Sequence, residues 1–359
     1  MKNFLFFLML GSLFAIGQSN ACTGIRLIAK NGEIVHGRTL EFGTPLPTSI
    51  AVIPRGYPFQ GTTPLGVGLS YKAKYGVVGA VLFDSSAAMD GMNEKGLSVG
   101  TFFFPGYAEY ASITSVNQSR AVSPTEFPNW LLTQFANVEE VKSALEQIAI
   151  APTQIDGWGS TPPPFHYIVY DQAGGCIVIE PIKGKLIVYD NPLGVLTNSP
   201  TFDWHMTNLR NYINLRTVNV PPLKINGLEL APFGQGSGMV GLPGDFTPPS
   251  RFIRAAVFSY TAIPSATGEE AVLQIFHLLN QFDIPVGVVR DVKNGTVHPD
   301  STMVTCARDP NTLKYYFKTY KDQTLRMVDL NEFDLNAKKI KKIKADGNEP
   351  IVNVSADLK

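Results

Sequence analysis

Residues 22–42 read CTGIRLIAKNGEIVHGRTLEF, and this stretch predicts the first supersecondary unit of the fold. Apolar and polar side chains alternate along Thr23–Ala29 and again along Glu33–Phe42, as in half-buried β-strands. Lys30-Asn31-Gly32 stands between the two runs, and Asn-Gly in that position is the strongest short-range hairpin signal. The stretch therefore predicts two antiparallel strands joined by a tight turn.

The register of this hairpin places candidate functional residues relative to one another. Counted from a two-residue turn at Asn31-Gly32, the ladder puts Cys22 opposite Glu41, with Cβ atoms about 4.5–5.5 Å apart. A carboxylate there could hydrogen-bond an α-ammonium group on Cys22 and hold it over the thiol. Arg38 lies on the other face of an ideal strand, so it would reach Cys22 only through a bulge or sharp twist, which Gly37 would tolerate.

The segment before Cys22 has the layout of a secretory signal peptide. Lys2 gives a charged start, Phe4–Ile16 (FLFFLMLGSLFAI) is an apolar run, and Ser19 and Ala21 form a small-residue cleavage site. The run is too short for a membrane span, which takes about 20 apolar residues. We therefore expect residues 1–21 to be removed on export, leaving a periplasmic or secreted protein.

Cleavage after Ala21 would make Cys22 the first residue of the mature protein. Its thiol, a strong nucleophile, and its freed α-amine, a base of pKa about 7.7–8.0, would then belong to one residue. Two other interpretations stay open: a cysteine near the cleavage point by chance, and a lipidated cysteine whose sulfur takes no part in chemistry. A bacterial lipobox usually carries an aliphatic residue three positions before the cysteine, where this chain has Ser19.

The composition is that of an ordinary globular protein, with 44% hydrophobic and 17% charged residues. Lys plus Arg and Asp plus Glu number 30 each, which gives no electrostatic footprint for nucleic acid or for an anionic membrane. No second apolar run reaches the length of a membrane span. Without residues 1–21 the chain is long enough for one large domain or two small ones.

Only three cysteines are present, fewer than a disulfide-stapled exported protein would carry. Cys176 and Cys306 stand in apolar, strand-like runs, so we expect two buried thiols, with a bridge between them as the alternative. The histidines are scattered, and His205 is expected to be a packed or surface residue. No Cys/His spacing fits a zinc site, so the sequence predicts no metal site.

Strands gather in antiparallel groups while helices fall in the middle of the chain, which predicts an α+β fold of packed layers. Ser123 and Thr267 are predicted helix N-caps. Residues 216–248, rich in Pro and Gly, are predicted to be loop, and the basic tail from Asn336 to be a solvated extension. Further strands are predicted at 49–54, 76–83, 97–104, 166–170, 176–180, 186–189, 303–308, 313–319 and 324–329, and helices at 123–135, 138–148, 204–214, 250–260 and from 267.

Several short motifs along the chain, taken together, resemble one known family. The chain resembles the choloylglycine hydrolase family of N-terminal-nucleophile hydrolases, which comprises the conjugated bile salt hydrolases and the penicillin V acylases. The matching motifs occur in the family's order from residue 22 to about residue 330, which is far more specific than any one of them. They are CTGIR (22–26), GRTLE (37–41), GMNEKGL (91–97), FPGYA (104–108), LTNSPTFDW (196–204), TNLRNY (207–212), GLPGD (241–245) and SRF (250–252).

The resemblance implies a four-layer αββα sandwich, with two antiparallel sheets between helical layers. It implies one domain over residues 22–335, with residues 336–359 as a polar, basic tail. It also implies hydrolysis of a linear amide bond in a small-molecule substrate, without metal or cofactor, and a homo-oligomer, a tetramer as in the family.

The resemblance also assigns catalytic roles to five residues of this chain. Cys22 would be the nucleophile and its α-amine the base, while Arg38 and Arg251 would line the catalytic centre. The oxyanion hole would consist of the Asn198 side-chain amide and the Phe103 backbone N–H.

Two positions depart from the family pattern. The family's usual aspartate after the first arginine is Glu41 here, which keeps the charge with one more methylene group, so we expect Glu41 to be a catalytic residue with the role of that aspartate. Phe103 stands where bile salt hydrolases typically carry Asn and penicillin V acylases carry Tyr. A backbone donor is indifferent to its side chain, so we expect this second change to affect substrate choice and not the reaction.

The aromatic residues near the site suit a bulky, apolar acyl group. Phe102, Phe103, Phe104 and Trp204 are the residues we expect to contact it. Conjugated bile salts and penicillin V are the favoured substrates, with N-acyl homoserine lactones as an alternative. An alternative of another class is a lipidated, non-catalytic or binding protein on the same fold.

Overall fold

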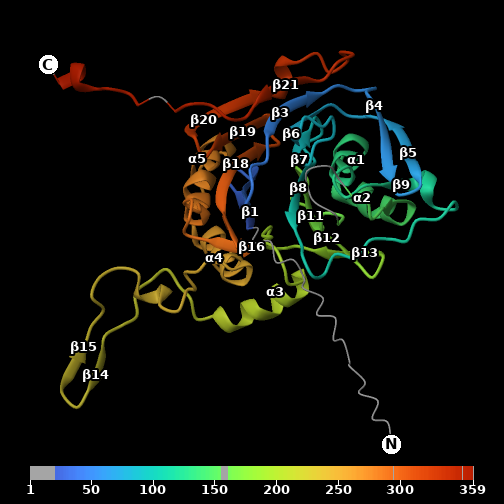
Figure 1. Cartoon of the computed structure of the whole chain (residues 1–359). Helices are drawn as coiled ribbons and strands as arrows, with labels where there is room; N and C mark the ends of the chain where they lie inside the picture. The colour runs from blue at the N-terminus through green and yellow to red at the C-terminus, as the bar shows by residue number, and fades with distance from the viewer. Residues whose placement is uncertain (1–20, 155–160, 294, 350, 359) are drawn as a thin grey trace, which may run out of the picture.

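Two antiparallel sheets lie face to face, with helices on both outer surfaces (Figure 1). The computed structural model describes residues 21–154, 161–293, 295–349 and 351–358. These four layers form the αββα sandwich, so the predicted fold class is confirmed. Apart from Ala21, the predicted signal peptide lies outside the described residues.

The five-stranded sheet combines the first hairpin with strands from near the end of the chain. Its order is β1-β2-β18-β19-β20, so β18 pairs directly with β2. Each predicted strand is confirmed to within two residues. The bounds are Cys22–Ile28 (β1), Ile34–Phe42 (β2), Ser301–Asp309 (β18), Lys314–Thr319 (β19) and Asp322–Asp329 (β20).

The eight-stranded sheet has the order β13-β12-β11-β8-β7-β6-β3-β21 and contains the predicted meander β11-β12-β13. Its central strands are buried over their whole length, as expected for a sheet covered on both faces. The bounds are Thr48–Ile53 (β3), Val77–Leu82 (β6), Asp90–Asn93 (β7), Ser98–Phe103 (β8), Phe165–Tyr170 (β11), Cys176–Ile182 (β12), Lys185–Asp190 (β13) and Lys341–Lys344 (β21).

Helices cover the outer face of each sheet. α4 (Pro248–Thr261) and α5 (Gly268–Leu279) pack on the five-stranded sheet, and α3 (Phe202–Leu209) lies beside α4. α1 (Phe127–Gln134) and α2 (Val138–Ala144) pack on the eight-stranded sheet. Apolar side chains fill the two sheet–helix interfaces and the space between the sheets.

The N-terminus of one helix is as predicted and that of another is not. Thr267 caps α5, because its hydroxyl accepts the Glu270 N–H at 3.3 Å. α1 begins at Phe127 and not at Ser123. The Ser123 N–H does donate to Glu126 Oε2 at 2.8 Å, which is half of a capping box, but residues 123–126 form a turn before the helix.

The first hairpin pairs one residue out of the predicted register. Cys22 lies opposite Leu40, and Ile28 opposite Ile34. The connection is not a two-residue turn: the Gly32 N–H donates to the Ala29 carbonyl at 3.0 Å, and Gly32 takes a φ of +86°. A turn followed by a left-handed glycine makes a loop one residue longer, which shifts every pair by one position.

Several short strands were not predicted. Two lie in the Pro/Gly-rich segment, where β14 (Leu223–Ile225) and β15 (Leu228–Leu230) turn at Asn226 and Gly227, both with positive φ. The tail is not wholly a solvated extension, because β21 pairs with β3. All four of its side chains are exposed, so no apolar alternation marked it. The others are Asp90–Asn93 (β7), which belongs to the eight-stranded sheet, and Pro58–Thr63 (β4), Gly66–Lys72 (β5), Ala121–Val122 (β9), Ala149–Ile150 (β10), Arg290–Lys293 (β16) and Thr296–Pro299 (β17).

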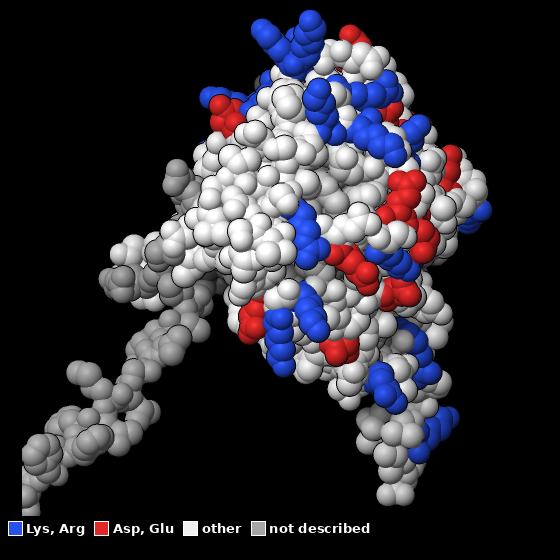
Figure 2. Space-filling view, turned by 90° about the vertical axis from the view of Figure 1, so that its right-hand side faces the viewer, with Lys and Arg blue, Asp and Glu red and all other residues white. Residues whose placement is uncertain are grey.

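The cysteine prediction is confirmed. Cys176 and Cys306 are buried free thiols, so the alternative of a bridge is wrong. Figure 2 shows basic and acidic side chains interspersed over one face. Among the described helices, none is both long and apolar enough to cross a membrane.

Candidate active site

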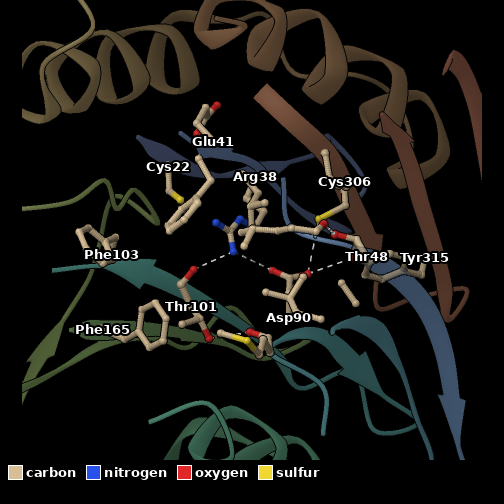
Figure 3. Close-up of a pocket in the computed structure, with 17 residues that line it drawn as sticks. Cys22, Arg38, Glu41, Thr48, Asp90, Thr101, Phe103, Phe165, Cys306 and Tyr315 are labelled. Carbon is tan, nitrogen blue, oxygen red and sulfur yellow. Dashed lines mark hydrogen bonds and ion pairs between the residues drawn. The ribbon is translucent and has the colours of Figure 1, made fainter. Parts of the chain in front are cut away.

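A cavity of about 40 Å³ lies between the two sheets beside Cys22 (Figure 3). Cys22 is the first residue of β1 and is buried. Polar side chains line one part of the cavity, namely Arg38, Asp90, Thr101, Cys306 and Tyr315, and Glu41 also borders it. The remaining wall is apolar and includes Leu40, Phe42, Leu46, Leu82, Met89, Phe103, Phe165 and Val304.

The register of β1 and β2 puts Arg38 on the thiol face of the sheet. Cys22 and Leu40 are paired, and Arg38 stands two residues before Leu40, so all three side chains point the same way. The pairing of β1 with β2 is continuous, which means that no bulge at Gly37 is needed. Both residues line the cavity, and the Arg38 guanidinium lowers the pKa of the Cys22 thiol, although burial outweighs it (Figure 3). Arg38 and Cys22 therefore share one face of the sheet because of the strand register, and not because of a bulge.

Arg251 and Asn198 join Cys22 in one buried hydrogen-bonded group. The Cys22 nitrogen donates to Asn198 Oδ1 at 2.9 Å, and Arg251 Nη2 donates to the same oxygen at 2.7 Å. Arg251 Nη1 donates to the Cys22 carbonyl and, at 3.1 Å, to Thr23 Oγ1. Because Oδ1 accepts from two donors, the Asn198 amide has a fixed orientation, with Nδ2 as its donor atom.

The Phe103 backbone faces this group. The Phe104 N–H donates to the Pro164 carbonyl at 2.8 Å, and Phe103 pairs with Phe165 across β8 and β11. Since bonded and non-bonded pairs alternate in an antiparallel ladder, the N–H and carbonyl of Phe103 point away from β11. That carbonyl accepts Asn198 Nδ2 at 2.8 Å, so the Phe103 N–H points to the side where Asn198 lies.

His205 packs against the backbone of Asn198. Its Nε2 lies 2.9 Å from the Asn198 carbonyl oxygen, and its ring stacks on Phe252 at 4.6 Å between centroids. Burial lowers the pKa of His205 to about 4, so the ring is neutral. The prediction of a packed histidine is confirmed.

Burial dominates the electrostatics of the Cys22 thiol. It raises the pKa of Cys22 above the ordinary value, and the nearby Arg38 and Arg251 guanidiniums oppose it only in part. The Glu41 carboxyl raises this pKa further. A neutral thiol is therefore the resting state in this site.

Glu41 lies on the opposite face of β2 from the thiol, toward the helices (Figure 3). The expectation that Cys22 and Glu41 are paired is wrong, because the longer turn shifts the register. Glu41 Oε1 accepts the Thr302 hydroxyl at 3.0 Å, and Oε2 is buried without a partner among the described residues. Burial raises the pKa of Glu41 to about 8.

Of the four aromatic residues expected to bind substrate, only Phe103 lines the cavity. Phe102 is buried against Gly24, and the Arg38 guanidinium carbon lies 4.5 Å from the centroid of its ring, in a cation–π contact. Phe104 is buried and stacks on His166 at 4.2 Å between centroids. Trp204 is 43% exposed on α3, outside the cavity. The alternation of side chains along β8 turns Phe102 and Phe104 away from Phe103.

Sequence reasoning missed the polar residues at the back of the cavity. Asp90 stands one position before the GMNEKGL motif and was not considered. Cys306 was expected only as a buried hydrophobe, yet its sulfur lies 3.4 Å from Asp90 Oδ1. The strand that Asp90 begins, β7, was itself not predicted, so no local signal marked Asp90 as buried. In the part of the chain that the structure describes, no cluster of metal-ligand side chains occurs.

Comparisons with known proteins agree on one family. The family model described as linear amide C-N hydrolases, choloylglycine hydrolase family, matches residues 22–352. The chain is 36% identical over 326 residues to a bile salt hydrolase/transferase of Clostridium perfringens, an alignment covering 90% of this chain and 96% of that protein.

Solved structures show the same relationship. A variant of the conjugated bile acid hydrolase from Clostridium perfringens superposes with a TM-score of 0.83 at 34% identity, covering 93% of this chain and 100% of that one. The penicillin V acylase from Agrobacterium tumefaciens shares the fold, with a TM-score of 0.72 at 24% identity over 90% of this chain and 91% of that one.

Proposed function

The chain belongs to the choloylglycine hydrolase family of linear amide C–N hydrolases, and we propose that it is an exported amidase whose nucleophile is the N-terminal cysteine of the mature protein. The observation that carries this proposal is the buried group formed by Cys22, Asn198 and Arg251, with Arg38 on the thiol face of the same sheet. Such a site pairs a thiol with preorganised hydrogen-bond donors, as acyl transfer requires.

The chemistry needs a base, and the proposed base is the α-amine of Cys22. The thiol is neutral at rest because burial raises its pKa. The Cys22 nitrogen, still bonded to Ala21 in the described chain, donates to Asn198 Oδ1 at 2.9 Å. After cleavage the α-amine would keep this acceptor while its lone pair becomes free to take the thiol proton. The start of the family match at Cys22 supports this assignment.

The proposed reaction proceeds through a thioester. The α-amine takes the thiol proton, the sulfur attacks the amide carbonyl, and the carbonyl oxygen becomes an oxyanion between Asn198 Nδ2 and the Phe103 N–H. The protonated amine then gives its proton to the leaving nitrogen as the C–N bond breaks. A water molecule attacks the thioester, releasing the acid and restoring the thiol. Each oxyanion donor is typically worth about 2.7–4 kcal/mol.

Glu41 is proposed to stabilise the ammonium form of the α-amine from the other side of the strand. Its Oε2 is buried without a partner among the described residues, so a nearby cation would satisfy it. Glu41 is a neighbour of Cys22 although the two are not paired in the ladder, because the Glu41 N–H donates at 3.0 Å to the carbonyl of Ala21, the residue directly before Cys22.

The acyl group of the substrate is proposed to be bulky and apolar. The cavity wall includes Leu46 and Met89, which come from the two segments 43–47 and 83–89 at its border. A volume of about 40 Å³ holds only a few waters, so these segments would have to separate to admit such a group. Conjugated bile salts or penicillin V are the favoured substrates, and N-acyl homoserine lactones are the alternative.

A homo-oligomer, a tetramer as in the resembled family, is also proposed. The hairpin β14–β15 projects from the body of the protein (Figure 1). Its exposed side chains include Leu223, Ile225, Leu228 and Leu230, and such a patch is typical of an interaction site.

Two measurements on the purified mature protein test the proposed function. Intact mass should show a chain that starts at Cys22 with a free amine and thiol, in the periplasm or medium. A panel of glycocholate, taurocholate, penicillin V and acyl homoserine lactones should then find at least one amide that is hydrolysed, with Cys22→Ala as the control. A diacylglycerol adduct on Cys22 without turnover would instead support a lipidated, non-catalytic protein.

A further inference from the structure

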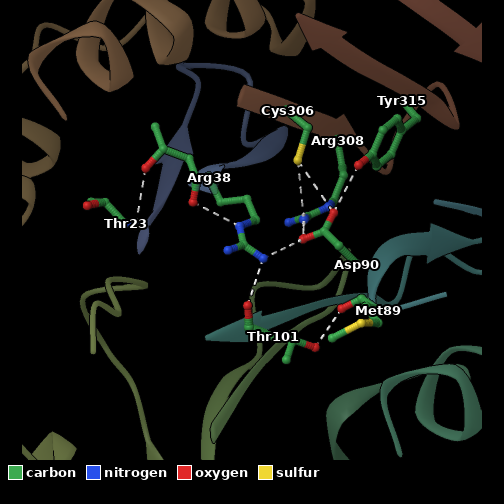
Figure 4. A network of polar contacts seen from close by, with 9 residues as sticks. Thr23, Arg38, Met89, Asp90, Thr101, Cys306, Arg308 and Tyr315 are labelled. Carbon is green, nitrogen blue, oxygen red and sulfur yellow. Dashed lines mark hydrogen bonds and ion pairs between the residues drawn. The ribbon is translucent and has the colours of Figure 1, made fainter. Parts of the chain in front are cut away.

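Asp90 is a buried carboxylate that links the two sheets behind Arg38 (Figure 4). It begins β7 of the eight-stranded sheet, whereas the side chains around it come from the five-stranded sheet. Asp90 Oδ2 accepts from Arg308 Nη2 and, at 3.5 Å, from Arg38 Nη1. Oδ1 accepts the Tyr315 hydroxyl at 3.0 Å and the Cys306 thiol at 3.4 Å. Asp90 is therefore shared by two arginines, and Arg308 is the closer one.

Only one nitrogen of the Arg38 guanidinium contacts the Asp90 carboxylate, at 3.5 Å. Its Nη1 donates mainly to the Thr101 carbonyl at 2.7 Å, and its Nε donates to the Thr39 carbonyl at 3.1 Å. Its Nη2 is buried without a partner among the described residues. The guanidinium lowers the pKa of the Cys22 thiol and lies on the same side of the sheet (Figure 3). A thiolate on Cys22 would therefore be a suitable anionic partner for Nη2.

The ion pairs next to Cys22 carry more positive than negative charge as long as the thiol is neutral. Burial alone would raise the pKa of Asp90, but the Arg308 and Arg38 guanidiniums outweigh it and hold that pKa below its ordinary value. Asp90, Arg38 and Arg308 thus carry one net positive charge.

The other ionisable groups packed on these residues do not remove this excess. Tyr315 and Tyr170 are buried, and burial raises the pKa of each far above neutrality. Burial raises the pKa of Cys306 to about 12, so this thiol is also neutral. His36, near Arg308, is neutral because burial lowers its pKa. Around Cys22 itself, the further ionisable neighbours are Glu41 and Arg251.

We propose that Arg308 is a positioning residue for the nucleophile: by binding Asp90, it keeps that carboxylate from pairing fully with Arg38, whose guanidinium then stays directed at the Cys22 sulfur. The proposal rests on the proposed role of Cys22 as nucleophile. Arg308 itself does not touch the reacting atoms and acts only through Asp90 and Arg38. Without Arg308, Asp90 would close its 3.5 Å contact with Arg38 and draw that guanidinium away from the sulfur.

The test measures the ionisation of Cys22 directly, as the rate of alkylation by iodoacetamide across pH, followed on the N-terminal peptide by mass spectrometry. An opposite charge within 4–6 Å shifts a pKa by about 1–3 units. In Arg308→Met, the Arg38 guanidinium should move toward Asp90 and act less strongly on the thiol. The thiol pKa should therefore rise, and alkylation should slow about tenfold at a pH below that pKa. The acid limb of kcat/KM should move to higher pH by the same amount.

The double variant Arg308→Met/Asp90→Asn separates charge from structure. It removes one positive and one negative charge together, so Arg38 is again free to face the sulfur, and the wild-type alkylation profile should return. A change that persists in the double variant, or no change in Arg308→Met, would overturn the proposal. Arg308→Gln gives the same expectation as Arg308→Met and retains a hydrogen bond to Asp90, which protects the measurement against misfolding.

Tyr315→Phe is the matched control. It removes a neutral donor from the same carboxylate, at 3.0 Å, without changing the charge, so the alkylation profile should stay in place. Because alkylation does not depend on turnover, the readout distinguishes two failures. A protein that shows the shift but hydrolyses no amide contradicts the proposed function alone. One that hydrolyses amides without the shift contradicts only the role of Arg308.

Discussion

Arg251 ties Asn198 to the first residue of β1: its Nη2 donates to Asn198 Oδ1 at 2.7 Å while its Nη1 donates to the Cys22 carbonyl. One guanidinium therefore fixes both the proposed nucleophile and a proposed oxyanion donor. Both groups are already held in place in this structure. Preorganisation of this kind is the main source of electrostatic catalysis in acyl transfer.

Asn198→Ala should lower kcat by about 10²–10³ with a smaller effect on KM, because a donor to an oxyanion acts mainly in the transition state. Steady-state kinetics on the best amide of the panel measure this. Ser199→Ala is the control, since the Ser199 hydroxyl donates to the Pro105 carbonyl at 2.7 Å and does not line the cavity. A rise in KM alone would show that Asn198 binds substrate and transition state equally.

Phe103→Ala should keep catalysis and change the ranking of acyl groups. The backbone N–H remains, whereas apolar contact worth up to about 3 kcal/mol for a bulky acyl group is lost. The ratio of kcat/KM between a bulky and a small acyl amide is the measurement. Phe104→Ala is a useful contrast, because this side chain is core and its loss should lower stability by about 3–5 kcal/mol without altering that ratio. Equal loss on every substrate in Phe103→Ala would mean that the donors are wrongly assigned.

Cys22→Ala should abolish hydrolysis with an intact fold, and Cys22→Ser should leave little activity, since serine is the poorer nucleophile. A form that retains Ala21 before Cys22 should be nearly inactive as well, because an amide nitrogen cannot accept the thiol proton. Thermal melting checks the fold, and single-turnover assays check activity. Substantial turnover by the form that retains Ala21 would refute the N-terminal mechanism.

Glu41 should make the uncleaved chain less stable as the pH rises. Burial raises its pKa to about 8, from an ordinary value of 4.5. Between these values the unfolded chain has lost the proton that the folded chain retains, so the unfolding free energy falls with increasing pH. Glu41→Gln does not titrate, so its unfolding free energy should not show this dependence on pH. Near pH 8 the variant should be more stable than the wild type by up to a few kcal/mol.

Guanidinium chloride unfolding of the form that retains Ala21, at about pH 5 and about pH 8, measures this difference. Glu332→Gln, an exposed carboxylate, serves as the control. Parallel pH profiles for wild type and Glu41→Gln would show that Glu41 ionises normally in the folded chain.

Replacement of Leu223, Ile225, Leu228 and Leu230 by serine should reduce the assembly to smaller units. All four side chains are exposed on a hairpin that projects from the body, so the body of each subunit should stay folded. Light scattering coupled to size exclusion gives the mass. An unchanged mass would place any interface elsewhere.

Local sequence patterns determined most of the longer strands and most of the helices, whereas the αββα class came from the resemblance that the short motifs carry. The local patterns did so because period-two alternation and capping residues act within a few positions of one another. The resemblance to the family brought Arg38, Asn198 and Arg251 forward as site residues, while Cys22 was also marked by the cleavage site before it. The structure gathers these residues in one place.

Only the tertiary structure decided which face each residue takes and which distant groups meet. The register of the first hairpin depends on the positive φ of Gly32, and a slip of one position exchanged the faces of Arg38 and Glu41 relative to the thiol. Asp90 and Arg308 stand 218 positions apart and come from different sheets. Their ion pair exists because the sheets stack there, and no local pattern in the sequence encodes that stacking.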